Sequence, residues 1–366
     1  MYMIVLECVL ILTLLYCVCV CVCMCTGTGG GGSGGGDGGG DTLTVATDCS
    51  GIEAPIVALQ QMEVPYRLVW ASDTSQPAKK STIANGIVPE QWFDDMSKRD
   101  HSTLPKNIDV YVCGFPCQPF SKNNSNGQLG FGDGDRGTVF FHCVATIKAV
   151  RPQLVVLENV KNILYHDKGD TFKVIKSELS KIQGYQWHHG VLNTTHFGIP
   201  QNRERVYIVG CLDRDPSLPV ATHAHPSPLP GFLDDNITND TKPLTPHQQE
   251  IASTWGAIPD FDTVVRINGS INFLKGKKPG PICPTLDSNQ FYLPHRKRML
   301  HVSEALALQG FPKTFKLLGT KGEQQLLVGN TMSVPVLVAI FTANAVVGGG
   351  GGSSKDFAPA PSPAGE

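Results

Sequence analysis

The sequence predicts an α/β fold built on a sheet whose strands are mostly parallel. Short apolar runs rich in β-branched residues alternate with segments of helical period along residues 43–211. The first run, LTVAT at 43–47, leads through a glycine-containing turn into a helix that extends to about Met62. A strand, a glycine turn and a helix in that order bring a nucleotide-like ligand to the carboxyl end of the strand. We therefore expect the functional site along that edge of the sheet.

Further apolar runs continue the alternation of strands and helices. Asp73 ends the run YRLVWASD, and Glu158 follows the buried run VVL within PQLVVLENVKN (152–162). Both carboxylates therefore fall at strand ends, where a sheet of this class binds its ligands. The other predicted elements are strands at 108–113 and 206–210, a helix at 138–150, and a helix that opens at Asp170 with Phe172, Ile175, Leu179 and Ile182 on one face.

The composition is that of a globular protein long enough for one large domain and a smaller one. The 366 residues are 17% charged and 41% hydrophobic, with a formal net charge of −2. Because the chain has no overall basic character, nucleic-acid binding would depend on local patches. The six cysteines beyond residue 25 show neither paired zinc spacing nor a disulfide framework. We expect no bound metal and a reducing compartment, the nucleus or the cytoplasm.

The two ends of the chain have biased compositions. Residues 1–26 are apolar apart from Glu7, with a length that suits a membrane span or a signal sequence. The Cys-Val alternation within this stretch is also what a repeated TG dinucleotide encodes. We interpret 1–42 as a low-complexity apolar and glycine-rich leader, disordered or a gene-model artefact, and a membrane anchor is the alternative. The composition of 348–366 predicts a disordered tail.

The stretch GFPCQPFS at 114–121 is the centre of the predicted site. The polar, glycine-rich segment 122–137 that follows it predicts a long mobile loop. Cys117 lies where a central strand opens into that loop, which is where α/β sheets place their chemistry. Most cysteines in a reducing compartment are small buried hydrophobes, and we predict that role for Cys113 and Cys143. For Cys117 we expect a reactive thiol instead, because its surroundings resemble a motif of a known enzyme family.

GFPCQPFS resembles the nucleophile motif of the DNA cytosine-5 methyltransferases, and further motifs in order extend the resemblance over about 43–347. It implies a Rossmann-like S-adenosylmethionine-dependent methyltransferase fold, with a mixed and mostly parallel sheet and a small inserted target-recognition domain. The catalytic and cofactor-binding domain would span 43–211, the target-recognition region 212–295, and 296–347 would return to the catalytic domain. The implied methyl donor is S-adenosyl-L-methionine, and the implied partner is double-stranded DNA with its target base flipped out. We expect a monomer that is not attached to a membrane.

The resemblance assigns the catalytic residues. Cys117 would add to carbon-6 of cytosine, because a thiolate is the softest side-chain nucleophile and also a good leaving group. Glu158 matches the catalytic glutamate of the family's ENV motif, and loss of solvation beside an apolar run would raise its pKa and let it donate a proton. Arg203 and Arg205 in GIPQNRERVYIVG match a QxRxR motif and would supply positive charge. The alternative for the two arginines is a salt-bridged edge strand.

Other motifs imply contacts with the substrate. Gln201, Arg203 and Arg205 alternate, so they project to one face of a strand, toward carboxylates and the carbonyl oxygen of the cytosine. Arg136 lies in DRGTVFF, which is similar to a DxRG motif that contacts the target phosphate or base region. Thr285 lies in ICPTLDS, which resembles the Thr-Leu signature of the recognition region. The implied substrate-binding residues are Gln118, Ser121, Arg136, Gln201 and Thr285.

Two motifs are expected to bind the cofactor. DCSGIEAP (48–55) resembles a family motif that usually reads DLFAGIGG, with Cys49 in place of an aromatic residue that stacks on the cofactor. LVGNTMSVPVLVAI resembles the last family motif, which packs beside the first strand and completes the pocket. The implied cofactor-binding residues are Asp48, Ser50, Gly51, Ile52, Asp73, Pro116, Asn330 and Ser333.

Acidic residues complete the expected pocket. Asp73 corresponds to a family glutamate, and its carboxylate can accept hydrogen bonds from ribose hydroxyls. A solvated strand-end carboxylate is the alternative. Asp94 or Asp95 in FDDM lies near the expected adenine contact, and the sequence does not choose between them.

The recognition region carries basic residues that have two interpretations. They would contact phosphates, or they would form a solvated face. The residues are Arg266, Lys275, Lys277, Lys278, Arg296, Lys297 and Arg298.

Three other functions stay open at this point. A tRNA cytosine methyltransferase of the related branch would have PPCQPFT and a CFT-type segment, which this chain lacks. The intact Cys117, Glu158, Arg203 and Arg205 oppose a catalytically idle nucleic-acid-binding relative, but two departures from the family keep it open: Cys49, and Ser303 in place of an arginine. A membrane-anchored protein of unrelated function would require the order of the motifs to be coincidence.

Overall fold

The computed structural model describes residues 42–116, 131, 134–237, 243–255, 260–271 and 280–346. The side chains of 134–136 are outside this description. The chain divides into two units, 1–39 and 40–366, and the second contains every described residue. The predictions for the leader up to residue 41, for Cys117 and the loop that follows it, and for the tail therefore lie outside the described residues.

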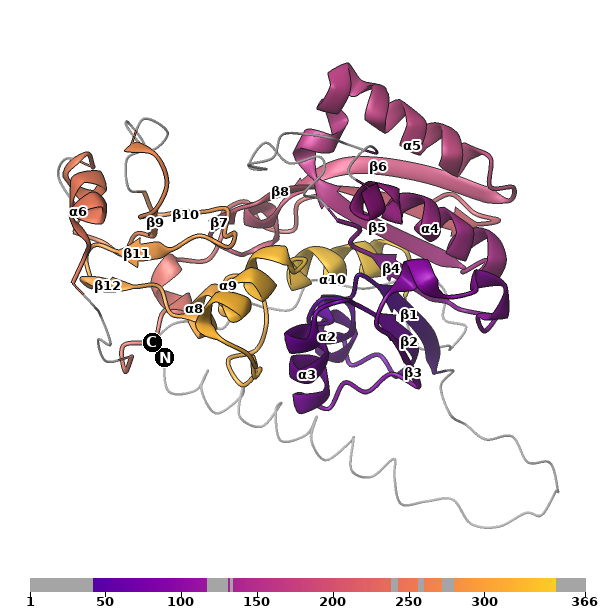
Figure 1. The fold of residues 1–366 in the computed structure, drawn as a ribbon, viewed down its shortest axis with the longest axis horizontal. Coiled ribbons are helices and arrows are strands. Elements are labelled where there is room, and N and C mark those ends of the chain that lie inside the picture. The colour runs from indigo at the N-terminus through magenta and orange to yellow at the C-terminus, as the bar shows by residue number, and fades with distance from the viewer. Residues whose placement is uncertain are drawn as a thin grey trace, which may run out of the picture. The chain divides into compact units, whose positions relative to one another are not determined.

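A seven-stranded sheet forms the centre of the described chain (Figure 1). Its strand order is β3-β2-β1-β4-β5-β8-β6. The pairs from β3 to β5 are parallel, whereas β8 runs antiparallel to both β5 and β6. The predicted mixed and mostly parallel sheet is confirmed. The strands are β1 (Leu43–Asp48), β2 (Tyr66–Ser72), β3 (Gln91–Phe93), β4 (Val110–Cys113), β5 (Leu154–Val160), β6 (Tyr185–Asn193) and β8 (Glu204–Leu212).

Helices cover both faces of this sheet because the central strands are apolar on both sides. On β4, Val110 and Val112 face one core cluster, and Tyr111 and Cys113 face the other. The first cluster is closed by α2 (Ala54–Gln61), α3 (Gln76–Ala84) and α10 (Val334–Ala343), and the second by α4 (Gly134–Val150) and α5 (Asp170–Ser180).

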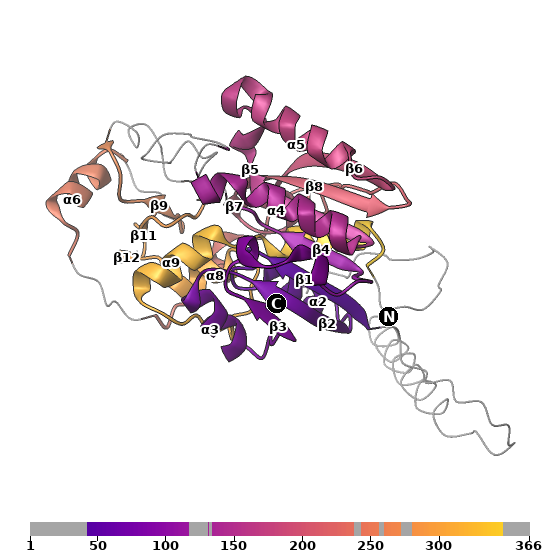
Figure 2. The ribbon, with the colours of Figure 1, turned by 45° about the vertical axis from the view of Figure 1, so that its right-hand side comes forward.

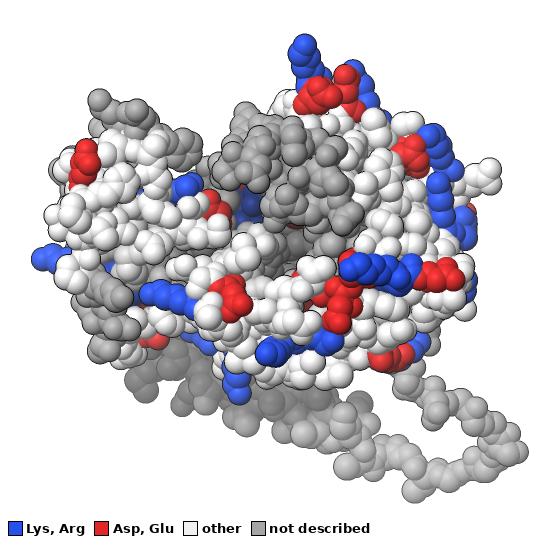
Figure 3. Space-filling model, in the orientation of Figure 1, with Lys and Arg blue, Asp and Glu red and all other residues white. Residues whose placement is uncertain are grey.

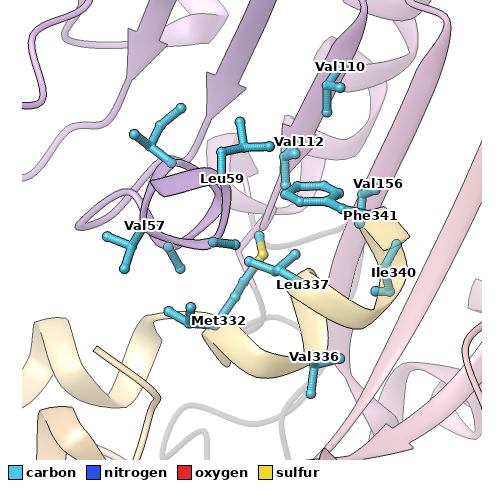
Figure 4. Close-up of a cluster of buried hydrophobic side chains, with 14 of the residues drawn as sticks. Val57, Leu59, Val110, Val112, Val156, Met332, Val336, Leu337, Ile340 and Phe341 are labelled. Carbon is cyan, nitrogen blue, oxygen red and sulfur yellow. The ribbon is translucent and has the colours of Figure 1, made fainter. Parts of the chain in front are cut away.

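The last helix lies at the heart of the first cluster. Figure 4 shows Leu337 and Phe341 of α10 directed toward Val112 and Val156 of the sheet. The segment Lys321–Ala343 contains α9 (Lys321–Asn330) and α10, and it is long and apolar enough to cross a membrane. However, 67% of its most apolar window is buried in the protein, and the core helix of a soluble protein passes the same test. The segment is therefore weak evidence for a membrane span.

A smaller part of the described chain lies beyond β7 (Gln201–Asn202) and α8 (Val302–Ala307), at one end in both Figure 1 and Figure 2. Its antiparallel sheet consists of β9 (Val265–Arg266), β11 (Phe291–Leu293) and β12 (Arg298–Met299), and α6 (Pro246–Ser253) accompanies it. Strand β10 (Cys283–Pro284) pairs with β7 and links this part to the segment that leads into β8. The part overlaps the predicted recognition region 212–295, although β12 lies beyond it, and the bounds and role of that region stay predictions.

Short 3₁₀ helices complete the description. They lie at Met96–Lys98, His101–Thr103, Lys161–Leu164, His166–Gly169, Thr194–Phe197 and Leu229–Phe232.

Candidate active site

Hydrogen bonds join the turn after β1 to the end of β2, at the edge of the sheet where the cofactor is expected. The backbone N–H of Gly51 donates to Asp73 Oδ2 at 2.8 Å, and that of Ser75 donates to Asp73 Oδ1 at 2.8 Å. Burial raises the pKa of Asp73, although these two hydrogen bonds oppose the rise. Gly51 has φ +55°, a conformation that glycine adopts without strain. Asp73 is thus held at the place expected for a ribose acceptor.

Two other residues of this turn act mainly on its shape. The Ser50 hydroxyl donates to Ser72 O at 3.1 Å and accepts from Ser72 N at 3.0 Å, which fastens the turn to β2. The Ile52 side chain is fully buried in the first core cluster. Any cofactor contact of Ile52 would therefore involve its backbone.

Asp48 does not have the position that the sequence suggested. Its side chain is only 1% exposed and accepts hydrogen bonds from Trp70 Nε1 at 3.2 Å and from the Tyr111 hydroxyl at 2.7 Å. Arg99 adds a two-pronged ion pair to the same carboxylate. Since the carboxylate is enclosed by these donors, Asp48 supports the turn from inside the protein and is not placed to touch a cofactor.

Arg99 is a structural residue that the sequence patterns did not single out. It comes from the segment after β3, and its guanidinium lies over the Phe93 and Trp70 rings, 5.0 and 5.6 Å from their centroids. Arg99 also donates to Thr146 on α4 at 3.0 Å. No local motif marks this arginine, because its partners come from three distant elements.

Glu53 occupies the position at which the family motif has a glycine. It has φ 61° and precedes α2, and its side chain is fully buried. The Thr47 hydroxyl donates to Glu53 Oε1 at 2.8 Å, while Oε2 has no hydrogen-bond partner among the described residues. Burial raises the pKa of Glu53 to about 8, so the carboxyl is largely protonated at neutral pH.

The segment that leads into Cys117 is held by β5 and α4. Asn159 Nδ2 donates to Phe115 O at 3.0 Å, and the Phe115 ring packs on Phe140 of α4 with 5.5 Å between centroids. The half-buried Pro116 is the last described residue before Cys117. Asn159 belongs to the ENV motif, yet its clamp on Phe115 was not anticipated. Of the expected site residues, Cys117, Gln118, Ser121 and the Arg136 side chain lie outside the description.

Glu158 lies beside this segment. A Cβ built on Gly114 would be 3.8 Å from Glu158 Oε2 and 2.8 Å from the Met332 methyl carbon. Glu158 is 7% exposed, and its Oε1 lies 3.3 Å from Arg205 Nε. Burial raises the pKa of Glu158 more than the charges of Arg205 and Arg203 lower it. The buried acid, its cation and the Gly-Phe-Pro backbone therefore meet at one point.

Gln201 and Arg203 were expected to face carboxylates and the cytosine, but both side chains bind backbone groups of the protein. Arg203 is 2% exposed, and its guanidinium donates to the carbonyls of Leu286, Gly329 and Thr331 at 2.7–3.0 Å. Gln201 is fully buried, with Nε2 donating to Leu308 O and Oε1 accepting from Leu286 N. Both side chains join the recognition region and the C-terminal segment to the sheet, so only Arg205 of the three reaches Glu158 directly.

The remaining expected residues lie on the same connecting segments. The hydroxyl of the half-buried Thr285 donates a hydrogen bond to Asn202 O at 2.6 Å. Asn330 is exposed at the end of α9. Ser333 is buried at the start of α10, and its hydroxyl has no hydrogen-bond partner among the described residues.

Three arginines in or directly after the recognition region are paired with acids within the protein. Arg296 pairs with Asp262 and Asp235, and Arg266 lies 3.4 Å from Asp287. The third arginine is Arg298, which forms a buried pair with Glu304. On the face shown in Figure 3, most Lys and Arg surfaces likewise lie beside acidic ones. These arginines fit neither a free phosphate-binding row nor a simple solvated face, and Lys275, Lys277 and Lys278 lie outside the description.

A cavity of about 630 Å³ opens beside β3. Trp92 and Phe93 give it aromatic walls, and Asp94 and Asp95 give it carboxylates. Asp94 accepts from Lys79 and Asp95 accepts from Ser97, and both acids line the cavity, so the adenine contact stays undecided between them. The cavity is open to solvent and has a mixed polar and apolar lining.

The fold and these sites define an α/β enzyme of the S-adenosylmethionine-dependent methyltransferase class. A mutant DNMT2 from Spodoptera frugiperda has the same fold, with TM-score 0.59 and 16% identity over 83% of this chain and 100% of that one. A putative DNA modification methyltransferase encoded within an Escherichia coli prophage gives TM-score 0.60 and 19% identity over 83% and 99%. Residues 48–345 match the model of the C-5 cytosine-specific DNA methylases, and the chain belongs to that family.

Curated relatives agree with this assignment. The type II methyltransferase M.HaeII of Haemophilus aegyptius is 36% identical over 271 residues, which cover 69% of this chain and 78% of the relative. M.NgoBI of Neisseria gonorrhoeae is 32% identical over 74% of this chain and 84% of the relative. The resemblance drawn from the motifs is confirmed, and the protein is a DNA (cytosine-5) methyltransferase.

Proposed function

We propose that this protein transfers a methyl group from S-adenosyl-L-methionine to carbon-5 of a flipped-out cytosine in DNA, through a transient covalent bond between Cys117 and the base. The observation that carries the proposal is the position of Glu158. Its buried carboxyl lies against Gly114, three residues before Cys117, and beside Arg205. An acid, a cation and the approach to a thiol are thus assembled on one edge of the sheet.

The residues at the carboxyl edge suit the cofactor that the family implies. Asp73 offers acceptors for ribose hydroxyls, and the cavity beside β3 offers aromatic walls and carboxylates for an adenine. When bound, S-adenosyl-L-methionine supplies an electrophilic methyl group. The protein's own contribution there is to orient the ligand and to keep water away.

Cys117 supplies the nucleophile. Carbon-5 of cytosine is too weak a nucleophile for direct methylation, and addition of a thiolate at carbon-6 gives carbon-5 the character of an enamine. A free thiol has a pKa of about 8.5, so only a few per cent is ionised at neutral pH. Nearby positive charge increases that fraction, and Arg205 is the candidate whose guanidinium lies at Glu158.

Glu158 acts as the proton donor to ring nitrogen 3. Its raised pKa keeps a larger share of the carboxyl protonated at neutral pH. General acid assistance of this kind contributes about 100- to 10,000-fold in rate. After methyl transfer, loss of the carbon-5 proton releases the thiol from carbon-6. The base must leave the duplex for these steps, which costs a few kcal/mol.

The experiment uses the full chain with labelled S-adenosyl-L-methionine and either duplex DNA or tRNA. We expect label in DNA, no label with Cys117→Ala, and a loss of about 100- to 10,000-fold with Glu158→Gln. An oligonucleotide with 5-fluorocytosine should form a stable covalent adduct with the wild-type protein, because the proton lost from carbon-5 is replaced by fluorine.

Three results would contradict the proposal. Label in tRNA alone would favour the tRNA enzyme, and no label in either substrate would favour an idle relative. Methylation of DNA without any 5-fluorocytosine adduct would refute the covalent step.

We further propose that the protein is a monomer and that it works in a reducing compartment. The free state of the described cysteines Cys49, Cys113, Cys143, Cys211 and Cys283 is compatible with such a compartment.

A further inference from the structure

Three thiols outside the catalytic step gather behind the cofactor-binding edge. Cys113 ends β4, Cys49 directly follows β1, and Cys143 lies on α4. The Sγ atoms of Cys113 and Cys143 are 3.1 Å apart, and both residues are fully buried. Cys49 lies next to them, because Asp48, which directly precedes it, pairs with Cys113 across β1 and β4, and the Cys49 thiol lies 3.9 Å from the Met96 sulfur. The prediction that Cys113 and Cys143 are buried, which came from the usual behaviour of cysteines in a reducing compartment, is confirmed, but it did not place them together.

The distance between the two buried thiols is close to what a disulfide needs. A disulfide bond is about 2.05 Å long, so Cys113 and Cys143 require an approach of about 1 Å. One thiol is on a strand and the other on the helix packed over that strand. A small shift of α4 toward the sheet therefore suffices, with no rearrangement of the strand order.

We propose that Cys113 and Cys143 form a modification site, in which a hydroperoxide converts the pair into a disulfide and Cys49 relays the oxidation. The Cys49 thiolate breaks the O–O bond and becomes a sulfenic acid, and the peroxide leaves as an alcohol, or as water from hydrogen peroxide. The Cys113 thiol then forms an S–S bond with Cys49 and releases water. Finally Cys143 attacks the Cys113 sulfur, which returns Cys49 as a thiol. In sum, two thiols and one hydroperoxide give one disulfide, one alcohol and one water.

Accessibility makes Cys49 the entry point. It is partly exposed, whereas Cys113 and Cys143 are enclosed by the second core cluster. The neighbouring Cys113 thiol lowers the pKa of Cys49, but burial and the charges of Cys143, Asp73 and Asp48 raise it above the ordinary value. Because the thiolate is the reactive form, we expect slow oxidation at neutral pH and faster oxidation as the pH rises. The site would thus respond to sustained exposure.

The disulfide would act on the catalytic segment. Cys113 directly precedes Gly114, and Phe115 packs on Phe140, which lies one helical turn before Cys143. Drawing β4 and α4 together displaces both supports of the segment that ends at Cys117. A misplacement of about 1 Å costs about 100-fold in rate. This loss of activity rests on the proposed function, whereas formation of the disulfide does not.

The first test maps disulfides by peptide mass spectrometry after hydrogen peroxide treatment of the reduced full chain. We expect a Cys113–Cys143 linkage with Cys49 recovered as a thiol. Cys49→Ala should slow formation of the Cys113–Cys143 linkage about tenfold or more, because the variant lacks the thiol that reacts with the peroxide first. Cys143→Ala should stop at a Cys49–Cys113 linkage. Cys283→Ala, which removes a buried cysteine of a different cluster, should change nothing.

Two results would overturn the proposal. One is the absence of the Cys113–Cys143 linkage in a wild-type protein whose Cys49 is oxidised. The other is formation of the linkage at an unchanged rate in Cys49→Ala.

A second readout is DNA methylation before and after oxidation, with Cys49→Ala as the reference for any loss that comes from oxidation of Cys117 itself. Wild type should lose more of its own starting activity than Cys49→Ala, and dithiothreitol should restore the difference. An equal loss in both would overturn the inhibitory role. A reduced protein that does not methylate DNA would instead contradict the proposed function, and the linkage map would still decide whether the modification site exists.

Discussion

Arg205 and Glu158 form an ion pair across the antiparallel strands β8 and β5, with 3.3 Å between Arg205 Nε and Glu158 Oε1. The carboxyl is buried, and burial raises its pKa, while the two nearby arginines pull it down again. The proton affinity of Glu158 therefore depends on a balance between lost solvation and a cation that is itself only partly exposed. The ion pair thereby controls whether Glu158 can act as an acid near neutral pH.

Replacing Arg205 by Leu should move the pH dependence of the reaction. Removal of the cation raises the pKa of Glu158 further, because Arg205 now lowers it. In the proposed mechanism the protonated acid is active, so kcat falls as the pH rises through that pKa. We expect this fall to occur at higher pH in Arg205→Leu, with a lower maximum. The measurement is kcat for DNA methylation as a function of pH.

The control for this experiment lies on the same strand. Glu204→Gln breaks the exposed pair between Lys161 and Glu204, which is 2.9 Å long. It should leave the pH profile of kcat in place. A profile of Arg205→Leu that coincides with that of Glu204→Gln would show that Arg205 does not tune the acid.

Asn159→Ala should weaken both the fold and the reaction. The substitution leaves the carbonyl of Phe115 buried without its donor at 3.0 Å, a cost of about 1–3 kcal/mol. Since Phe115 is two residues before Cys117, we also expect a lower kcat. Urea unfolding and initial rates give the two quantities. Gln60→Ala, which removes an exposed hydrogen bond to Tyr66, should affect neither, and similar behaviour of the two variants would contradict the clamp.

Arg203→Met tests whether the buried arginine is structural. Three carbonyls lose a charged donor, and we expect the free energy of unfolding to fall by about 3 kcal/mol or more. Arg205→Leu, by contrast, should lower activity with little loss of stability. Chemical denaturation of the two variants makes the comparison. Equal stability of Arg203→Met and wild type would return Arg203 to the role expected from its motif.

Glu53→Gln should alter the dependence of stability on pH. The pKa of Glu53 is about 8 in the folded protein and about 4.5 in a solvated chain. The unfolded chain therefore loses its proton first, and stability falls by about 1.4 kcal/mol per pH unit from pH 4.5 until it levels off near pH 8. Glu53→Gln removes this term and should be more stable than wild type at pH 8.

Glu63→Gln provides the matched control for Glu53. Glu63 has a similar backbone φ of 55° but an exposed side chain. It should leave the stability curve unchanged. If wild type and Glu53→Gln show the same slope between pH 5 and 8, Glu53 is not buried in the way the turn suggests.

The strands and the class of site followed from local patterns. Apolar runs located β1, β2, β4, β5 and β8 because buried parallel strands are apolar on both faces. The same reasoning gave no sign of β6, an edge strand with the mixed sequence YQWHHGVLN. Its exposed positions need no apolar side chains, so periodicity carries little signal there.

The partners of polar side chains could not be derived from the sequence. The alternation of side chains along a strand placed Gln201 and Arg203 on one face, as the structure has them. However, this face is covered by backbone carbonyls of residues more than 80 positions away. Asp48 was expected to bind the cofactor because its motif resembles one of the family, and the arginine that neutralises it lies 51 residues further on. Motifs thus identified the family and the acid, while tertiary contacts decided which polar groups of these motifs face inward.

The placement of α10 has a consequence for how the protein is made. The helix supplies Leu337, Ile340 and Phe341 to the apolar face of β1, β4 and β5, although it belongs to the last segment of the described chain (Figure 4). While the ribosome is still translating, α2 and α3 can cover that face only in part, and exposed apolar strands are prone to aggregate. Completion of the core must therefore wait until the final helix has left the exit tunnel, and chaperones would be needed most during that interval.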